Sequence, residues 1–249
     1  MKLCIHRGHE IPEGCTKCPY HGLRAGLERL PEVYDVDVKE NNSLCATDLE
    51  SFNHKKAEWF FVYEQQVKAP YYLWMQNTMD FNHLDLVHPE FSKMFEGRPE
   101  DVKFDMNGCL SRYRIKIRKT IIEGFEHLLR QRLEPYFYHL TSFPNFSLTS
   151  FAGVFLSSEL ALKNLEGCKV RTVFYKAKDK ELPEEFYENA KIKNAKILQE
   201  DKAICESWAK TYHNHEHKHW LPDEERIRVY VDLLKKYEPY YSSNCDYKT

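Results

Sequence analysis

The dipeptide Asn107-Gly108 predicts an antiparallel β-hairpin in this chain, because Asn-Gly between two strand-like segments is the strongest short-range signal for such a turn. The segment after the turn, residues 109–120, alternates between apolar side chains and basic ones. This alternation is typical of a strand with one buried and one solvated face. We therefore predict a hairpin from residues 101–106 and 109–120. The side chains expected on its solvated face are Arg112, Arg114, Lys116 and Arg118.

The remaining patterns predict further strands and three helical segments. Segments with strand-like composition and turn signals at their ends are 57–66, 143–162 and 168–176. Segments with helical patterns are 71–87, 183–212 and 223–237. Pro183, followed by two glutamates, is a favourable helix start. We therefore expect an α+β fold in which helices pack on one face of an antiparallel sheet.

Charge and length exclude several classes of protein. A formal net charge of −2 over 249 residues argues against a broad electrostatic surface for nucleic acid or anionic membrane. No apolar run approaches the roughly 20 residues that span a bilayer, and the N-terminus lacks the apolar segment of a signal peptide. We expect a soluble, cytoplasmic protein. Its eight cysteines would then be thiols or metal ligands rather than disulfides.

Two short Cys-His pairs near the N-terminus form the first candidate metal site. The pairs are Cys4 with His6, and Cys18 with His21. Close pairs on two loops can hold a metal centre from opposite sides. Two thiolates and two imidazoles suit a [2Fe–2S] cluster with histidines on one of its irons. The same donors at such spacings also bind Zn²⁺, so ligand spacing alone leaves both alternatives open.

A second candidate site contains Asp80, His83 and His88. Two histidines five residues apart on a regular helix project about 140° from each other, which is too far for one metal. Because Pro89 disfavours helical geometry at His88, we expect the helix to end near Val87 and His88 to turn back. Two histidines and a carboxylate would then suit a non-haem Fe(II) ion. The same histidines also fit the surface of an amphipathic helix.

Both motifs, taken with their flanking residues, resemble those of the Rieske-type ring-hydroxylating oxygenases. The N-terminal strings that carry the resemblance are Cys4-x-His6-Arg7-Gly8 and Cys18-Pro19-Tyr20-His21-Gly22. The string around the second site, residues 76–88, resembles the iron-binding helix of the same family. A third segment, residues 199–206, resembles the family's C-terminal Glu-Asp segment. The resemblance covers most of the chain.

The resemblance implies a ligand set for each of two iron centres. The implied ligands of a [2Fe–2S] Rieske cluster are Cys4, His6, Cys18 and His21. The implied ligands of a mononuclear Fe(II) ion are His83, His88 and Asp201. Glu200 and Glu206 are the alternatives to Asp201 as the third ligand.

The resemblance also implies a bridge between the two centres. Asp80 would hydrogen-bond to a Rieske histidine, His21, of a neighbouring subunit and couple the cluster to the iron. Asp85, which lies between the two histidines of the second motif, is the competing carboxylate. Electron transfer between subunits requires a closed ring, and the family's usual assembly is a head-to-tail homotrimer.

The family's architecture divides the chain into two domains. Residues 1–45 would form a small Rieske β-domain, shortened at its N-terminus, since only three residues precede Cys4. Residues 46–249 would form the catalytic domain, a helix-grip fold in which a curved antiparallel sheet folds around a long helix.

The implied activity is that of an oxygenase component. Electrons from NAD(P)H would pass through a reductase, with or without a ferredoxin, to the cluster and then to Fe(II). O₂ would there hydroxylate an aromatic or apolar small molecule, as a mono- or dioxygenase, or demethylate it. The alternative function is a small metal-binding or [2Fe–2S] electron-transfer protein without oxygenase turnover.

Overall fold

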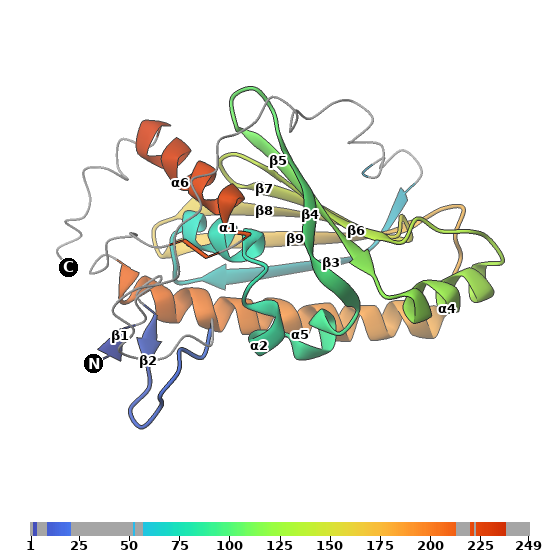
Figure 1. The fold of residues 1–249 in the computed structure, drawn as a ribbon, viewed down its shortest axis with the longest axis horizontal. Helices are drawn as coiled ribbons and strands as arrows, with labels where there is room; N and C mark the ends of the chain where they lie inside the picture. Colours follow the sequence, from blue (N-terminus) through green and yellow to red (C-terminus); the bar gives the residue numbers. More distant parts are fainter. Residues whose placement is uncertain are drawn as a thin grey trace.

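A computed structural model describes most of the chain, and its elements form an antiparallel sheet with helices packed against it (Figure 1). The described residues are 2–3, 9–20, 52, 57–212, 220–221 and 223–237. Near the N-terminus, β1 (Lys2–Leu3) pairs with β2 (Glu10–Ile11). Within the described ranges, none of the helices combines the length and apolar character that a bilayer crossing demands.

The main sheet has seven strands in the order β3-β9-β8-β7-β6-β5-β4. Its strands are β3 (Ala57–Val67), β4 (Phe95–Phe104), β5 (Leu110–Ile117), β6 (Tyr136–Ser142), β7 (Phe146–Phe151), β8 (Phe155–Asn164) and β9 (Gly167–Ala177). Every neighbouring pair is antiparallel. Strands β4 to β9 follow one another in sequence, whereas the first strand, β3, pairs with the last, β9. The predicted α+β architecture is confirmed.

Pairing of the first strand with the last brings two distant helices together. Helix α1 (Tyr71–Met79) follows β3, and the 26-residue α5 (Glu184–Ala209) follows β9. Because α5 is about 39 Å long, it runs back along the sheet to reach α1 (Figure 1). The other helices are α2 (Leu84–Val87), α3 (Pro89–Ser92), α4 (Lys119–Leu129) and α6 (Glu225–Tyr237).

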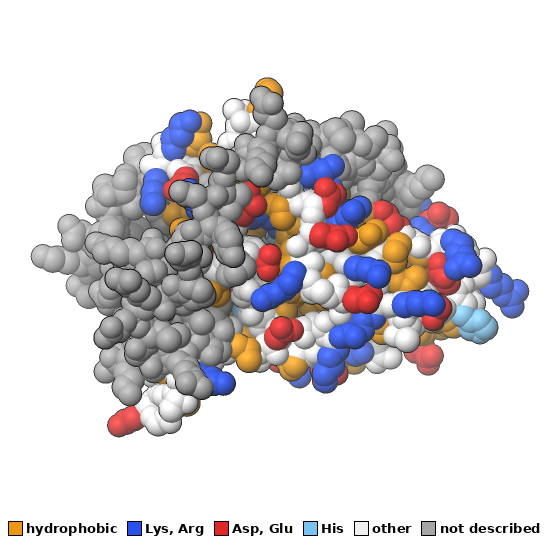
Figure 2. All heavy atoms as spheres, viewed as in Figure 1, with side chains coloured by type: hydrophobic (Ala, Val, Ile, Leu, Met, Phe, Trp, Pro, Cys, Tyr) orange, Lys and Arg blue, Asp and Glu red, His pale blue; other side chains and the backbone are white. Residues whose placement is uncertain are grey.

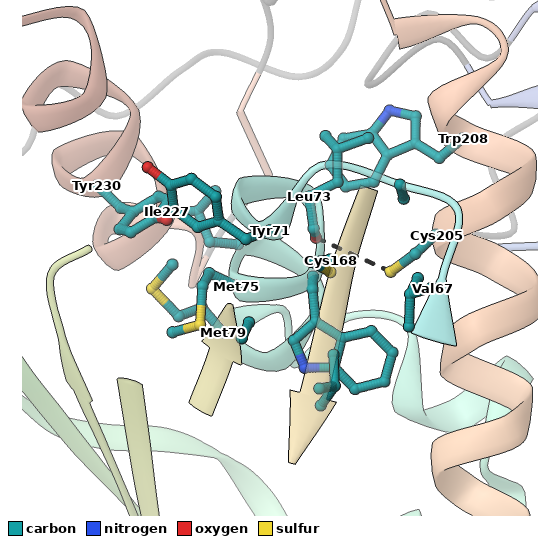
Figure 3. Packing of buried hydrophobic residues seen from close by; sticks show 14 of the residues in the cluster. Val67, Tyr71, Leu73, Met75, Met79, Cys168, Cys205, Trp208, Ile227 and Tyr230 are labelled. Atoms are coloured by element: carbon teal, nitrogen blue, oxygen red, sulfur yellow. Dashed lines mark hydrogen bonds between the residues drawn. The ribbon is translucent and has the colours of Figure 1, made fainter. Parts of the chain in front are cut away.

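The main hydrophobic core fixes α1 between the sheet and α5. Trp74 of α1 and Trp208 of α5 are both fully buried. Figure 3 shows Leu73 of α1 close to two buried cysteines, Cys168 of β9 and Cys205 of α5. Each fully buried large apolar side chain contributes about 1.5–3 kcal/mol. The relative position of α1 and α5 is therefore held by the core.

The predicted hairpin is confirmed, with different strand limits. Its turn at Asn107-Gly108 is closed by the Gly108 amide, which donates to the Asp105 carbonyl at 3.0 Å, and Gly108 has a φ of +71°. The first strand begins at Phe95 rather than at residue 101. The second strand ends at Ile117, and residues 119–129 form α4, which the alternating pattern did not predict.

One side chain predicted in solvent is instead buried. Arg112 is 2% exposed, because its guanidinium donates to Asp101 at 2.8 Å and lies over the ring of Tyr138. Two others on this strand, Arg114 and Lys116, pair with glutamates of β4, Glu100 and Glu96. Basic and acidic side chains are likewise interspersed over the face in Figure 2.

The helix predicted over residues 71–87 is wrong as a single element. Helix α1 ends at Met79, and Asp80 has extended geometry with φ −81° and ψ 110°. The Oδ1 atom of Asp80 accepts a 2.9 Å hydrogen bond from the Asn82 amide, which stabilises a turn before α2. A side chain therefore ends this helix where no Gly or Pro is present.

Candidate metal centre

Three buried side chains converge where α1, α2 and α5 meet. The ligand atoms of His83, His88 and Asp201 all lie within 4.8 Å of one another. Asp201 Oδ1 is 2.9 Å from His88 Nε2 and 3.5 Å from His83 Nε2. Ligands about 2.1 Å from one ion and at right angles lie about 3 Å apart. The spacing and the donor set fit a divalent metal, including the Fe(II) expected from the sequence.

The backbone near α2 directs both histidines inward. His83 precedes α2 in helical geometry, and His88 follows it with φ −123° and ψ 57°. The sequence predicted non-helical geometry at His88 from Pro89, and the structure confirms it. The ring centroids of the two histidines lie 5.2 Å apart with the ring planes at 75°. The change of direction at His88 therefore lets both histidines face one site, which a continuous helix would not allow.

The two alternative carboxylates on α5 have different places. Glu200 Oε2 lies 2.8 Å from His88 Nδ1, on the side of the ring opposite Asp201. A carboxylate at this nitrogen fixes the tautomer and leaves Nε2 available for a metal. Glu206 instead accepts a 2.9 Å hydrogen bond from the Lys68 amide. Of the three acidic residues, Asp201 is the one that belongs to the group.

Asp201 is also held by an amide from α1. The Asn77 side chain donates a 2.8 Å hydrogen bond to Asp201 Oδ1, and Asn77 is fully buried. Sequence reasoning did not single out Asn77, although it lies within the string that resembles the iron-binding helix. Its position six residues before His83 is the one feature of the sequence that could have indicated a role at this site. The hydrogen bond itself joins residues 124 positions apart, which no local pattern predicts.

Electrostatics favour a charged carboxylate at the centre. Burial raises the pKa of Asp201, but hydrogen bonds from His83 and His88 outweigh it and hold that pKa well below its ordinary value. Burial lowers the pKa of His88, but the hydrogen bonds and charges of Asp201 and Glu200 outweigh it, so the net pKa is raised. The site therefore attracts positive charge, as a cation-binding site must.

The carboxylate at the predicted bridging position lies beside His83. Asp80 is 2% exposed, and its Oδ2 is 4.0 Å from His83 Nδ1. Asp85, the competing carboxylate, is exposed. Asp80 is thus placed next to a metal-ligand candidate, while Asp85 points away from the buried group.

Part of the first predicted site packs directly on the second. Cys4, His6 and His21 lie outside the described residues. Cys18 is 1% exposed and belongs to a small cluster with Ile11 and Tyr20. This cluster packs against one residue each of α2 and α5, Val87 and Ile204. Cys18 and Tyr20 of the N-terminal motif therefore lie next to the helices that carry the metal group of the same chain.

Tyr20 makes the contact between the two segments. Its ring stacks on His83 at 5.0 Å between centroids and 10° between planes, and on His9 at 4.4 Å. Its hydroxyl donates to Asn77 Oδ1 at 2.6 Å and lies 3.4 Å from His83 Nδ1. Sequence reasoning treated Tyr20 only as part of a motif. Its place between Cys18 and His21 did not reveal this contact.

Solved structures with a similar fold include Rieske oxygenases. One is a quaternary ammonium Rieske monooxygenase described for carnitine oxidation by gut microbiota and inter-subunit electron transfer, with a TM-score of 0.59 and 17% identity over 95% of this chain and 77% of that chain. Another is the quaternary ammonium Rieske monooxygenase CntA in complex with the inhibitor MMV12, with a TM-score of 0.51 and 16% identity over 84% of this chain and 66% of that chain. No protein-family model and no curated protein sequence matches the chain. The chain has the Rieske oxygenase fold.

Proposed function

We propose that this protein is the oxygenase component of a Rieske non-haem iron system, with Fe(II) bound by His83, His88 and Asp201. The observation that carries the proposal is the convergence of these three buried side chains, from segments more than a hundred residues apart, in a Rieske oxygenase fold. Two imidazoles and one carboxylate are the donor set of non-haem Fe(II) sites that use O₂.

The second iron centre of the proposal is a [2Fe–2S] cluster on the N-terminal motif. Its ligands would be Cys4, His6, Cys18 and His21, with residues 1–45 as the Rieske domain and residues 46–249 as a helix-grip catalytic domain. Burial of Cys18 supports this, because a thiolate ligand is shielded from water in such a domain. When bound, the two centres together supply electrons and O₂ chemistry for hydroxylation or demethylation.

The protein's own residues prepare the mononuclear site. Asp201 stays deprotonated because its pKa is held low, so it presents a charged ligand. Glu200 accepts from His88 Nδ1 and keeps Nε2 directed at Asp201. Burial of all three ligands excludes bulk water from the reacting centre. These residues therefore provide the metal ligands, orient the His88 ring and shield the site from bulk water.

Electron delivery completes the proposal. A reductase drawing on NAD(P)H, with or without a ferredoxin, would serve the cluster. Asp80 would accept a hydrogen bond from His21 of a neighbouring subunit in a homotrimer. Asp80 lies 4.0 Å from His83, which supports the end of this bridge at the mononuclear site. One similar structure is described in terms of inter-subunit electron transfer, which agrees with such an assembly.

The substrate of the proposal is a small organic molecule, which is hydroxylated or demethylated. The similar structures are described as monooxygenases that act on quaternary ammonium compounds, which supports one-oxygen chemistry over dioxygenation. In such a reaction one atom of O₂ enters the substrate and the other leaves as water, which consumes two electrons and two protons.

The decisive experiment is electron paramagnetic resonance with iron and sulfide analysis on anaerobically purified protein, before and after dithionite reduction. We expect a Rieske-type signal and about three irons per chain, two in the cluster and one at the mononuclear site. Asp201→Ala should keep the signal, lose the third iron and abolish substrate-dependent O₂ uptake. The control Glu206→Ala should keep the Rieske signal, the third iron and substrate-dependent O₂ uptake.

Two outcomes would contradict the proposal. Zinc in place of iron, with no Rieske signal, would mean that the N-terminal motif is a zinc site. A Rieske signal with two irons in the wild-type protein, unaffected by Asp201→Ala, would favour an electron-transfer protein without turnover.

A further inference from the structure

The helix-facing side of the sheet is unusually polar over two rows of paired residues. The first row is Ser111, Thr141, Ser147, Glu159 and Thr172. The second row is Tyr113, His139, Thr149 and Ser157. Two contacts show that the first row faces α1, since Trp74 donates to Glu159 and Thr141 contacts the sulfur of Met79. The face of a sheet that meets its helices is ordinarily apolar, so this interior is suited to a polar ligand.

A buried cation lies at one end of these rows. Arg226 of α6 is 2% exposed. Its guanidinium donates to Ser111 Oγ and O, to Thr141 Oγ1 and to His139 Nδ1, all neutral acceptors. No carboxylate of the described residues pairs with it. Burial lowers its pKa to about 10, so it is still charged at neutral pH. A buried charge without a counter-ion is costly, and binding an anion would remove that cost.

Three hydrogen-bond donors remain around this cation. The four contacts of Arg226 leave one of its five N–H groups. His139 is neutral, because burial and the Arg226 charge hold its pKa well below the ordinary value. Since its Nδ1 accepts from Arg226, its Nε2 carries the proton. The Tyr113 hydroxyl has no hydrogen-bond partner among the described residues, and its ring lies 4.7 Å from the Arg226 guanidinium carbon.

This donor group lies beside the end of α1 that precedes the metal-binding segment. Thr141 Oγ1, which accepts from Arg226, is 3.6 Å from the sulfur of Met79, the last residue of α1. Asp80 follows directly, and its charge contributes to the raised pKa of Tyr113, about 12, of which burial is the larger cause. A molecule held by Arg226 would therefore lie next to the end of α1, which leads directly to the segment that carries His83 and His88.

We infer that Arg226, with His139 and Tyr113, binds a carboxylate or equivalent anionic group of the substrate, so that the substrate class is small organic acids. That the bound acid is the substrate rests on the proposed oxygenase function, whereas anion binding itself does not depend on turnover. The remaining N–H groups of Arg226 and His139 can only donate, and the Tyr113 hydroxyl can donate as well, so this set around one uncompensated positive charge favours an oxyanion.

Direct binding tests this inference without cluster, O₂ or reductase turnover. Benzoate, phenylacetate and butyrate would each be titrated calorimetrically into the purified protein beside their primary amides. At least one acid should bind about tenfold or more tightly than its amide, the size of one charge-assisted hydrogen bond. Arg226→Gln should reduce this ratio to near one, and Arg226→Lys should retain part of it.

Matched variants separate recognition from structural support. Arg112 is also 2% exposed but is paired with Asp101, so Arg112→Gln should lower stability and leave the acid-to-amide ratio unchanged. Tyr113→Phe removes one donor with little change in volume and should lower the ratio severalfold; it serves as the test if Arg226→Gln does not fold.

The outcomes are distinct from those for the oxygenase reaction. Equal binding of every acid and its amide by the wild-type protein, or an acid preference that survives both Arg226→Gln and Tyr113→Phe, would overturn the anion site. Neither result would affect the iron content or the Rieske signal. Conversely, an acid preference in a protein without turnover would support the anion site while the oxygenase function failed.

Discussion

The hydroxyl of Tyr20 donates a 2.6 Å hydrogen bond to the side-chain oxygen of Asn77. Asn77 uses its amide nitrogen for Asp201, so a residue of the N-terminal motif is two hydrogen bonds from a candidate metal ligand. Because Tyr20 fixes the orientation of the Asn77 amide, it also fixes which atom faces Asp201. The N-terminal segment and the metal centre are therefore mechanically connected.

Tyr20→Phe tests this connection. The variant keeps the ring on His83 but leaves the Asn77 oxygen without its donor, so the free energy of unfolding should fall by about 1 to 2 kcal/mol. Urea denaturation followed by tryptophan fluorescence measures it. Tyr237 is 52% exposed, and Tyr237→Phe should change stability little. Equal effects of the two substitutions would mean that the Tyr20 hydroxyl contributes nothing.

Glu200→Gln tests the orientation of His88. The variant loses the carboxylate acceptor 2.8 Å from His88 Nδ1, and loss of such a partner costs about 10- to 100-fold in metal affinity. Anaerobic competition with a chromophoric chelator for Fe²⁺ or Co²⁺ measures the affinity. Glu206→Gln, on the same helix, should bind as the wild type does. An undiminished affinity in Glu200→Gln would remove Glu200 from the site.

Metal affinity should decline on acidification, beginning above pH 6.5. A metal ion requires neutral His88, and the raised pKa of His88 means that protons compete at higher pH than for an ordinary histidine. Asp201 does not add to this decline near neutrality, because its pKa is lowered. Metal titrations from pH 5.5 to 8.5 give the profile. In Glu200→Gln the decline should begin at lower pH, since one cause of the raised pKa is gone.

Glu159 should make stability fall as pH rises. Burial raises its pKa to about 7 from an ordinary 4.5, although Trp74 and Thr172 donate to it. Between these values the folded state binds more protons than the unfolded state, so stability is fully present below pH 4.5 and decreases up to pH 7. The full loss is about 3 kcal/mol.

The comparison variant for this prediction is Glu159→Gln. It retains an acceptor for Trp74 and cannot ionise, so its unfolding free energy should lose this component of the pH dependence. Chemical denaturation of both proteins at pH 5, 6, 7 and 8 supplies the test. Parallel stability curves would show that Glu159 does not titrate in this range.

Local signals in the sequence predicted the parts of the fold that depend on neighbouring residues. The Asn107-Gly108 turn and the strands beside it were predicted because turn geometry and alternation are local properties. The break in the helix at Asp80 was not, since it comes from a side-chain hydrogen bond rather than from Gly or Pro. Burial of Arg112 depends on Asp101 across a hairpin with irregular register, which alternation does not encode.

In the candidate site, too, local features were predicted from the sequence and long-range contacts were not. His83 and His88 lie in one motif, and the bend between them follows from Pro89. Asp201 was selected by resemblance, with Glu200 and Glu206 left as alternatives, and distances in the fold separate the three. The contacts of Tyr20 and Asn77 join positions 57 residues apart, and no spacing in the sequence expresses them.

The pairing of β3 with β9 has a consequence for the biosynthesis of the protein. A chain still attached to the ribosome exposes β3, α1 and both histidines early, but their partner strand and Asp201 are translated more than a hundred residues later. The backbone N–H and C=O groups of β3 therefore remain without their partner strand until β9 emerges. The proposed three-ligand centre can therefore bind a metal only late in synthesis, after the long helix α5 has left the ribosome.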